Sequence, residues 1–338
     1  MRFKNIFFAA AAAMALTACS SDDAIETVQQ KSQFPEDGVM RFTTNLVDPT
    51  AVTTRASITG SDVNQNGQQF QVKIVNPASA MYSYFNRVQY NGTEWTPINR
   101  MLWQNDQQMI TVTAAYKQGK DFTDNEFVGG ANLTVAADQS SQANLNAQDL
   151  LTMPTKTISN PSQETTLMQN GKLVINFYHA LSKLDVTLEL KDQFFASSQN
   201  TADITDVKIS GTNLGYNFQP MTTANENYGT VTAAATPVAG DILPMKGSYT
   251  DATADSKHSF ATYESIIVPQ TIAAGQLTVS FKIGNRSFSW TNTQAYTLEQ
   301  GKHYTLPLTV GKDGVTAGSR AFSVTSWEDQ PGDNLGTE

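Results

Sequence analysis

Alternation of apolar and polar side chains with a period of two is the feature that most constrains this chain. Leu184, Val186, Leu188 and Leu190 are each separated by one polar residue, and residues 277–283 and 304–310 repeat the pattern. Successive side chains of a strand point to opposite faces, so the pattern predicts strands with one buried face. No stretch of ten or more residues holds an apolar period of 3.6, and only residues 142–151 suggest a short helix. The chain is therefore predicted to be all-β.

Further strands are predicted from less regular apolar runs bounded by Gly, Asn and Ser clusters. They span residues 39–47, 70–75, 81–90, 109–116, 173–178, 204–209, 259–268 and 322–327. Asn91-Gly92 and Gly284-Asn285 are dipeptides typical of two-residue hairpin turns. Pro307 cannot donate to a ladder, so its strand is expected at an edge or at a bulge. Residues 121–155 and 214–252 are expected to be long loops.

Many short strands between turn signals favour β-sandwiches. A single core stops growing near ~250–300 residues, so a chain of 338 residues is expected to hold two domains. The polar segment 192–203 interrupts two strand-rich halves. We therefore expect an N-terminal β-sandwich over residues 38–195 and a C-terminal one over residues 196–338.

The N-terminus is predicted to be a lipoprotein signal peptide over residues 1–18. Arg2 and Lys4 precede an apolar run over residues 6–16, which is shorter than the ~20 residues that span a bilayer. The chain's only cysteine, Cys19, follows in a Leu-Thr-Ala-Cys sequence that resembles the bacterial lipobox, whose cysteine is acylated. The alternative is a plain secretory signal beside an unrelated cysteine. Residues 19–37 are polar and acidic, as expected of a tether.

Charge and cysteine content exclude several functions. Removal of residues 1–18 takes away Arg2 and Lys4 and no acid, so the formal net charge falls from −9 to −11. An acidic chain of this kind is repelled by nucleic acid, which we exclude as a partner. Acylation of Cys19 would leave no thiol for disulfides, redox chemistry or zinc–thiolate sites.

No catalytic motif or cofactor site is present in the sequence. The three histidines, His179, His258 and His303, belong to no HExxH motif, and GxSxG, Walker and GxGxxG motifs are absent. Residues 62–67 match the first half of a calcium loop, but Lys73 stands where the bidentate acid is required. We therefore predict no enzyme, no metal and no cofactor. A glycosidase would need two facing carboxyl groups ~5–10 Å apart.

The four tryptophans leave two interpretations open. Trp95, Trp103, Trp290 and Trp327 each lie in or beside a predicted strand, which favours core packing. Trp95 and Trp103 are also candidates for an exposed platform on which a sugar could stack. An exposed, coplanar pair would favour glycan binding, whereas four buried indoles would exclude it.

Several separated stretches together resemble the fimbrillin family of type V pilin subunits and related surface lipoproteins. They are residues 16–23, 39–46, 53–56, 90–95 with the later Trp103, 177–184, 296–304 and 324–327. The resemblance implies two tandem transthyretin-like β-sandwiches. The acidic residues after Cys19 also resemble a tag that directs lipoproteins to the outer leaflet of the cell outer membrane, so a surface-exposed lipoprotein of a fimbrium is expected.

In that family a loop arginine is cut by a protease, the first strand leaves, and the groove accepts a strand from a neighbouring subunit. Carried over to this chain, Arg55 is the cut site, Ala56 the new N-terminus and residues 39–47 the lost strand. The alternative is that Arg55 is an ordinary cation in a threonine-rich loop. Residues 328–338 hold one aliphatic residue, a proline and two glycines, which is a poor donor strand.

Either residues 322–327 are themselves the donated strand, with Phe322 and Val324 as anchors on one face, or this subunit does not donate. The resemblance implies a non-catalytic fimbrial subunit or cell-surface adhesin. Its expected partners are other fimbrial subunits or copies of itself, the outer membrane through the lipid, and a host or bacterial surface ligand. The alternative is a monomeric glycan-binding surface lipoprotein.

Overall fold

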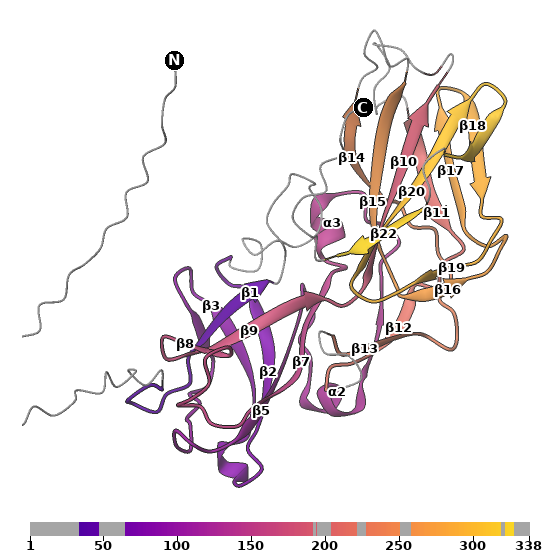
Figure 1. The fold of residues 1–338 in the computed structure, drawn as a ribbon. Helices are drawn as coiled ribbons and strands as arrows, with labels where there is room; N and C mark the ends of the chain where they lie inside the picture. Colours follow the sequence, from indigo (N-terminus) through magenta and orange to yellow (C-terminus); the bar gives the residue numbers. More distant parts are fainter. Residues whose placement is uncertain are drawn as a thin grey trace, which may run out of the picture. The chain divides into compact units, whose positions relative to one another are not determined.

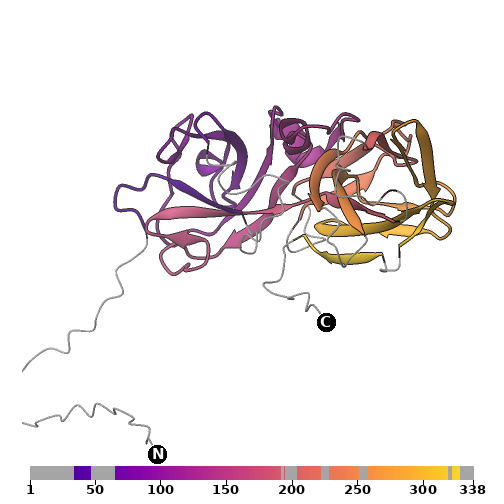
Figure 2. The same ribbon diagram turned by 90° about the horizontal axis from the view of Figure 1, so that it is seen from above.

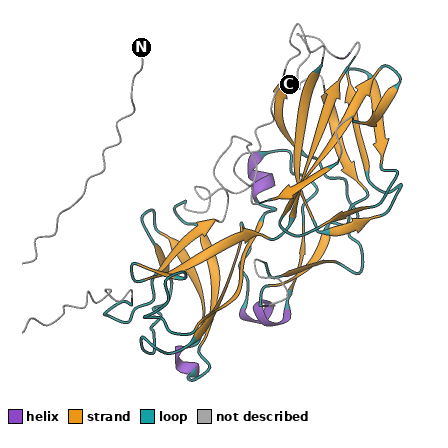
Figure 3. Cartoon of the chain, viewed as in Figure 1, coloured by secondary structure: helices purple, strands orange, loops and turns teal. Residues whose placement is uncertain are grey.

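The computed structural model describes residues 34–46, 65–191, 194, 204–221, 228–250, 258–318 and 322–327. Strands dominate these residues and the helices are short (Figure 3). The prediction of an all-β chain is confirmed, and each of the eleven predicted strands coincides with an observed one. Within the described ranges no helix is long and apolar enough to cross a bilayer.

The first sheet has eight strands in the order β1-β4-β3-β2-β5-β7-β9-β8 (Figure 1). An additional pairing of β1 with β9 closes the sheet on itself. Its interior is filled by fully buried side chains such as Phe70, Val72, Ile74 and Phe177. The strands are β1 (Phe42–Leu46), β2 (Gln69–Val75), β3 (Tyr84–Tyr90), β4 (Trp95–Pro97), β5 (Ile110–Lys117), β7 (Leu150–Ile158), β8 (Met168–Gln169) and β9 (Lys172–His179), and the 3-10 turn η1 (Ala80–Tyr82) follows β2.

A six-stranded sheet and a three-stranded sheet form a sandwich. The first has the order β14-β15-β10-β20-β21, with β22 also on β20, and the second the order β11-β17-β18. Apolar residues at every second position of β10, β17 and β20 are buried between them, as their alternation predicted. The bounds are β10 (Ser182–Leu190), β11 (Ile204–Ser210), β14 (Met245–Thr250), β15 (Ser259–Ile267), β17 (Thr278–Ile283), β18 (Arg286–Thr291), β20 (Lys302–Gly311), β21 (Gly314–Ala317) and β22 (Ser323–Ser326).

The two segments expected to be loops contain regular elements instead. They hold α2 (Asp124–Gly129), β6 (Ala131–Thr134), α3 (Gln142–Asn146), the start of β7, β12 (Gly215–Gln219), β13 (Thr230–Ala233) and β14. β6, β12 and β13 form a sheet of very short strands, and β16 (Gln270–Ile272) pairs with β19 (Tyr296–Leu298). Strands of three to five residues carry too few side chains for a visible period. They are specified by partners distant in sequence.

One predicted turn is right and the other is wrong. Ile283 pairs directly with Arg286 across Gly284-Asn285, which gives the expected two-residue loop, and Gly284 has a positive φ of 54°. Tyr90 instead pairs with Trp95, so the loop at Asn91-Gly92 has four residues. The Asn91 side chain accepts the backbone N–H groups of the third and fourth loop residues, which stabilises the longer turn.

The chain passes from the first sheet to the six-stranded sheet between β9 and β10. In Figure 2 the indigo and purple strands and the orange and yellow strands form two groups. The described residues nevertheless belong to one compact unit, and a third apolar cluster joins Ala115 of β5 to Ile266 of β15. The division at residue 195 and the transthyretin-like topology stay predictions.

Candidate functional site

β1 is the strand that closes the first sheet, and it is held in two ways. Phe42 pairs with Trp95 of β4 on one side, and the five residues of β1 run parallel to β9 on the other, from Leu173 to Phe177. The Phe42 side chain is 1% exposed and packs edge-on against Phe70, with ring centroids 6.2 Å apart. Burial of such a side chain contributes about 1.5–3 kcal/mol. Removing β1 would therefore uncover both a ladder edge and an apolar slot.

The residues that precede β1 extend this attachment. Met40 donates its backbone N–H to the Met101 carbonyl oxygen at 3.0 Å, and Trp103 donates to the Gly38 carbonyl oxygen at 2.9 Å. The Met40 side chain is also buried. We use the name β1 seat for the surface made by β4, β9, Phe70 and Met101 that receives residues 38–46.

Three predicted site residues lie outside the described residues. These are the lipid attachment site Cys19 and the two residues of the predicted cut, Arg55 and Ala56. A cut at that place would separate β1, which ends at residue 46, from β2, which begins at residue 69. The roles of all three residues stay predictions.

The last described strand, β22, covers one end of β20. It pairs antiparallel with β20 from Thr305 to Lys302, and β21 pairs with the other end of the same edge. Phe322 stacks on Tyr296 and Tyr304, with centroids 4.3 and 5.5 Å away, whereas Val324 is 55% exposed. Val324 lies opposite Tyr304, which is one of the rings on which Phe322 stacks. Both predicted anchors therefore lie on the same face of the strand. Their part in strand exchange stays a prediction.

A stacked pair of rings fixes the end of β22. The Trp327 indole lies parallel to the His179 imidazole at 4.4 Å with an interplanar angle of 4°. The backbone N–H of Trp327 donates to the Gly301 carbonyl oxygen at 2.8 Å. The His179 Nδ1 atom lies 2.8 Å from an Asp149 carboxylate oxygen, and both side chains are buried. The sequence shows His179 and Trp327 in separate motifs, and no spacing rule connects them.

The tryptophans do not form a sugar platform. Trp95 and Trp103 are each 5% exposed, and Trp290 and Trp327 are also buried. Trp95 packs against Phe70 with centroids 4.9 Å apart, inside the closed first sheet. A stacking platform needs an open ring face, so the prediction of glycan stacking at Trp95 and Trp103 is wrong. The core interpretation of these residues is the right one.

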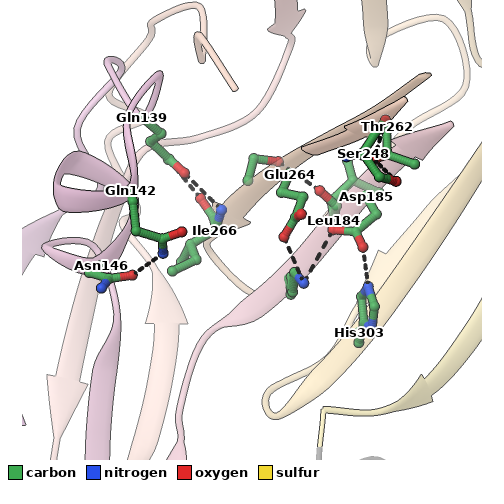
Figure 4. A network of polar contacts seen from close by, with 12 residues as sticks. Gln139, Gln142, Asn146, Leu184, Asp185, Ser248, Thr262, Glu264, Ile266 and His303 are labelled. Atoms are coloured by element: carbon green, nitrogen blue, oxygen red, sulfur yellow. Dashed lines mark hydrogen bonds and ion pairs between the residues drawn. The ribbon is translucent and has the colours of Figure 1, made fainter. Parts of the chain in front are cut away.

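A buried cluster of charges lies on the face of β10 and β15 that is turned away from the sandwich core. The Lys183 ammonium is 3.0 Å from a Glu264 oxygen and 3.6 Å from an Asp185 oxygen, and His303 Nε2 is 2.8 Å from the other Asp185 oxygen. Figure 4 shows His303 below Asp185, with Gln139 bonded to the Ile266 backbone nearby. No pattern in the sequence indicates this cluster, because its residues occupy the polar positions of alternating strands.

Burial and ion pairing shift the pKa values of this cluster in opposite directions. Burial alone would raise the pKa of Asp185, but the Lys183 ammonium and His303 outweigh it and lower that pKa. Burial raises the pKa of the Glu264 carboxyl above its ordinary value, although Lys183 acts against it. The Lys183 pKa is raised, since its two carboxylate neighbours outweigh its own burial. The groups thus neutralise one another, as in a structural ion-pair network. Within the described residues, neither this cluster nor any other holds three His, Cys, Asp or Glu side chains placed as metal ligands.

The chain is similar in sequence to one protein family and in fold to several solved structures. The sequence model of the fimbrillin-like family matches residues 54–327. No curated protein sequence matches the chain. A candidate cell adhesion protein from Bacteroides uniformis has 17% identity and a TM-score of 0.55, covering 87% of this chain and 99% of that one. A second, from Bacteroides ovatus, has 14% identity and a TM-score of 0.58, covering 86% of this chain and 98% of that one.

The family match spans most of the chain and includes the β1 to β2 connection from residue 54 onward, together with the β22 end at Trp327. A nearly all-β fold with a sandwich core agrees with that match. The chain belongs to the fimbrillin-like family. The resemblance found in the sequence is thereby confirmed.

Proposed function

We propose that this protein is a non-catalytic subunit of a fimbrium or a fimbrillin-like cell-surface adhesin. Membership of the fimbrillin-like family supports this role. The structural neighbours from Bacteroides uniformis and Bacteroides ovatus are described as candidate cell adhesion proteins, which agrees with it. Its partners would be other fimbrial subunits or copies of itself.

The arrangement of β1 carries the finer proposal of assembly by strand exchange. β1 closes the sheet between β4 and β9, and its chain connection to β2 contains Arg55. A cut after Arg55 would leave β1 attached by noncovalent contacts alone. Its loss would expose unpaired N–H and C=O groups of β9 beside the apolar slot that Phe42 fills, and an extended strand from a neighbour satisfies both.

We also propose that Cys19 carries the lipid that anchors the protein to the outer membrane. One acyl chain gives only marginal binding, because each buried methylene contributes ~0.8 kcal/mol. The two or three chains expected of a lipoprotein would hold it durably. Export as a lipoprotein would place the subunit on the cell surface, where it would meet other subunits.

The anchoring prediction concerns Cys19→Ala. This variant is expected to keep residues 1–18 uncleaved and to incorporate no radioactive palmitate when expressed in a bacterium that processes lipoproteins. Ser20→Ala is the matched control, since it changes a neighbouring small residue and leaves the thiol. Palmitate incorporation by Cys19→Ala would contradict the assignment.

The processing prediction concerns trypsin on the folded protein. Beyond the tether, which contains Lys31, the first cut is expected after Arg55, because Arg41 lies beside β1 and pairs bidentately with Asp37. The cut should leave the fragment with β1 bound until mild denaturant releases it. Arg55→Gln should delay the first cut by about tenfold or more, whereas Arg100→Gln should leave it unchanged. The measurement is mass spectrometry of the digest over time. A native N-terminus at Cys19 in assembled fibres would contradict maturation at Arg55.

A further inference from the structure

An open cleft of about 800 Å³ lies between β13 of the small sheet and the strand pair of β16 and β19. One wall is made by residues 231–233 of β13, and the other by residues 269–271 and 297–300. We call it the β13 cleft. None of its lining residues belongs to β1, β4 or β9, so it is distinct from the β1 seat.

The backbone of β13 turns one edge toward the cleft. In an antiparallel pair the N–H and C=O groups of alternate residues point to the same neighbour. Ala234 donates its N–H to Gly215 on the β12 side, whereas Val231 donates in the opposite direction, to the Gln300 side chain. The odd-numbered residues Val231 and Ala233 therefore face away from β12. β13 is the terminal strand of its sheet, and both residues line the cleft.

Three backbone groups on this edge are open. They are the carbonyl oxygen of Val231 and the N–H and carbonyl oxygen of Ala233, which form no hydrogen bond with any described residue. Such a row is a template for an added strand. Gln300 already pairs with the start of the edge, since its side-chain amide accepts from Val231 at 3.1 Å and donates to Gly229 at 2.9 Å. The edge of β13 thus binds the Gln300 side-chain amide at one end, and no described residue pairs with the next backbone groups along the edge.

The chemistry of the lining selects among occupants. The side chains are threonines, amides, two prolines and small apolar residues, without an aromatic ring on which a sugar or base could stack. The single charged residue is Glu299, which is exposed, and no described cation pairs with its carboxylate. The surrounding chain is acidic, with a formal net charge of −9. A basic ligand is therefore favoured over an acidic one.

We propose that the β13 cleft binds an extended peptide segment, which pairs as an added strand with the open edge of β13 and presents a basic residue to Glu299. The main-chain bonds to Val231 and Ala233 supply affinity, and the carboxylate supplies the charge preference. The proposal goes beyond the proposed function and does not depend on strand exchange at the β1 seat.

The test uses the full chain and a terminally blocked hexapeptide of sequence Thr-Val-Lys-Val-Thr-Thr. The peptide is expected to bind and to shift the amide NMR signals of Ala233 and Gln300. A peptide with N-methylated amides at alternate positions should bind about tenfold more weakly, because it cannot complete the ladder. This comparison needs no change in the protein. Equal binding of the methylated peptide would overturn the proposal, as would shifts confined to other strands.

Two protein variants complete the experiment. Ala233→Pro removes the outward N–H without touching the ladder to β12, and proline is tolerated on such an edge. Ala233→Pro should weaken binding of the lysine peptide about tenfold. The matched control Ala233→Ser should bind the peptide as the original chain does. Glu299→Gln should weaken binding of the lysine peptide severalfold. It should leave unchanged the binding of a peptide that has Gln in place of Lys. Binding of Ala233→Pro within about twofold of the control would overturn the added-strand geometry.

Discussion

Polymers of the Arg55-cleaved protein are expected to disappear when Val324 is replaced by aspartate. If β22 fills the groove of a neighbour, Val324 enters an apolar slot, and burying that side chain contributes about 1.5–3 kcal/mol. Val324→Asp would instead place an unpaired charge there, which costs more than the lost contact. In the isolated subunit Val324 is 55% exposed, so the aspartate should leave the fold intact. Light scattering after size-exclusion chromatography measures both results.

Thr325→Asp is the matched control for this experiment. Thr325 lies opposite His303 and is exposed, on the face of β22 turned away from Val324. Thr325→Asp should therefore add the same charge and leave the polymers intact. Polymerisation of Val324→Asp would show that β22 is not the donated strand. A cleaved protein that stays monomeric at high concentration would count against a stalk subunit and favour a terminal subunit or a monomeric adhesin.

Replacement of Lys183 by methionine is expected to destabilise the fold by about 3–5 kcal/mol at pH 7, since Asp185 and Glu264 would stay buried without their cation. Methionine keeps most of the side-chain volume, so the loss reports on charge rather than on a cavity. Urea unfolding measures it. Lys191→Met is the matched control, because Lys191 pairs with Glu189 at a more exposed place and should cost about 1 kcal/mol or less.

The pH dependence of Lys183→Met distinguishes charge from packing. Without the ammonium, burial raises the folded-state pKa of both carboxyl groups above the unfolded value, so the folded state binds more protons as the pH falls. The deficit relative to the original chain should therefore shrink between about pH 7 and pH 4. Combining Lys183→Met with Glu264→Gln should recover part of the stability at pH 7. A deficit independent of pH would assign the effect to packing.

The lengths of the strands decide how far the period of two carries a prediction of the fold. Strands of six or more residues, such as β10, β17 and β20, hold enough side chains for the buried face to be visible in the sequence. β4, β16 and β19 have three residues each, too few to show any period. β16 and β19 form because each supplies the other's ladder, and partners 24 to 28 residues apart leave no local trace.

The candidate site also combines features that local sequence patterns predict with features that only the fold determines. The lipobox at Cys19, the arginine at position 55 and the strand that became β1 are local patterns, and the sequence alone was enough to predict them. Whether an indole stacks on a sugar or fills a core depends on what covers it, and the structure buries Trp95 and Trp103. The partners of Lys183 were also hidden, since a polar position in an alternating strand predicts a solvated side chain until neighbouring strands enclose it.

The sequence by itself determined the all-β class, most long strands and the fimbrillin-like resemblance, because a period of two and short motifs are properties of neighbouring residues. Only the tertiary structure decided that β1 closes a sheet against β9, that Trp327 stacks on His179, and that β13 leaves an open edge beside a cleft. Each of these depends on pairing between residues far apart in the chain. Pairing over such distances is set by the packing of the whole fold, which no local pattern encodes.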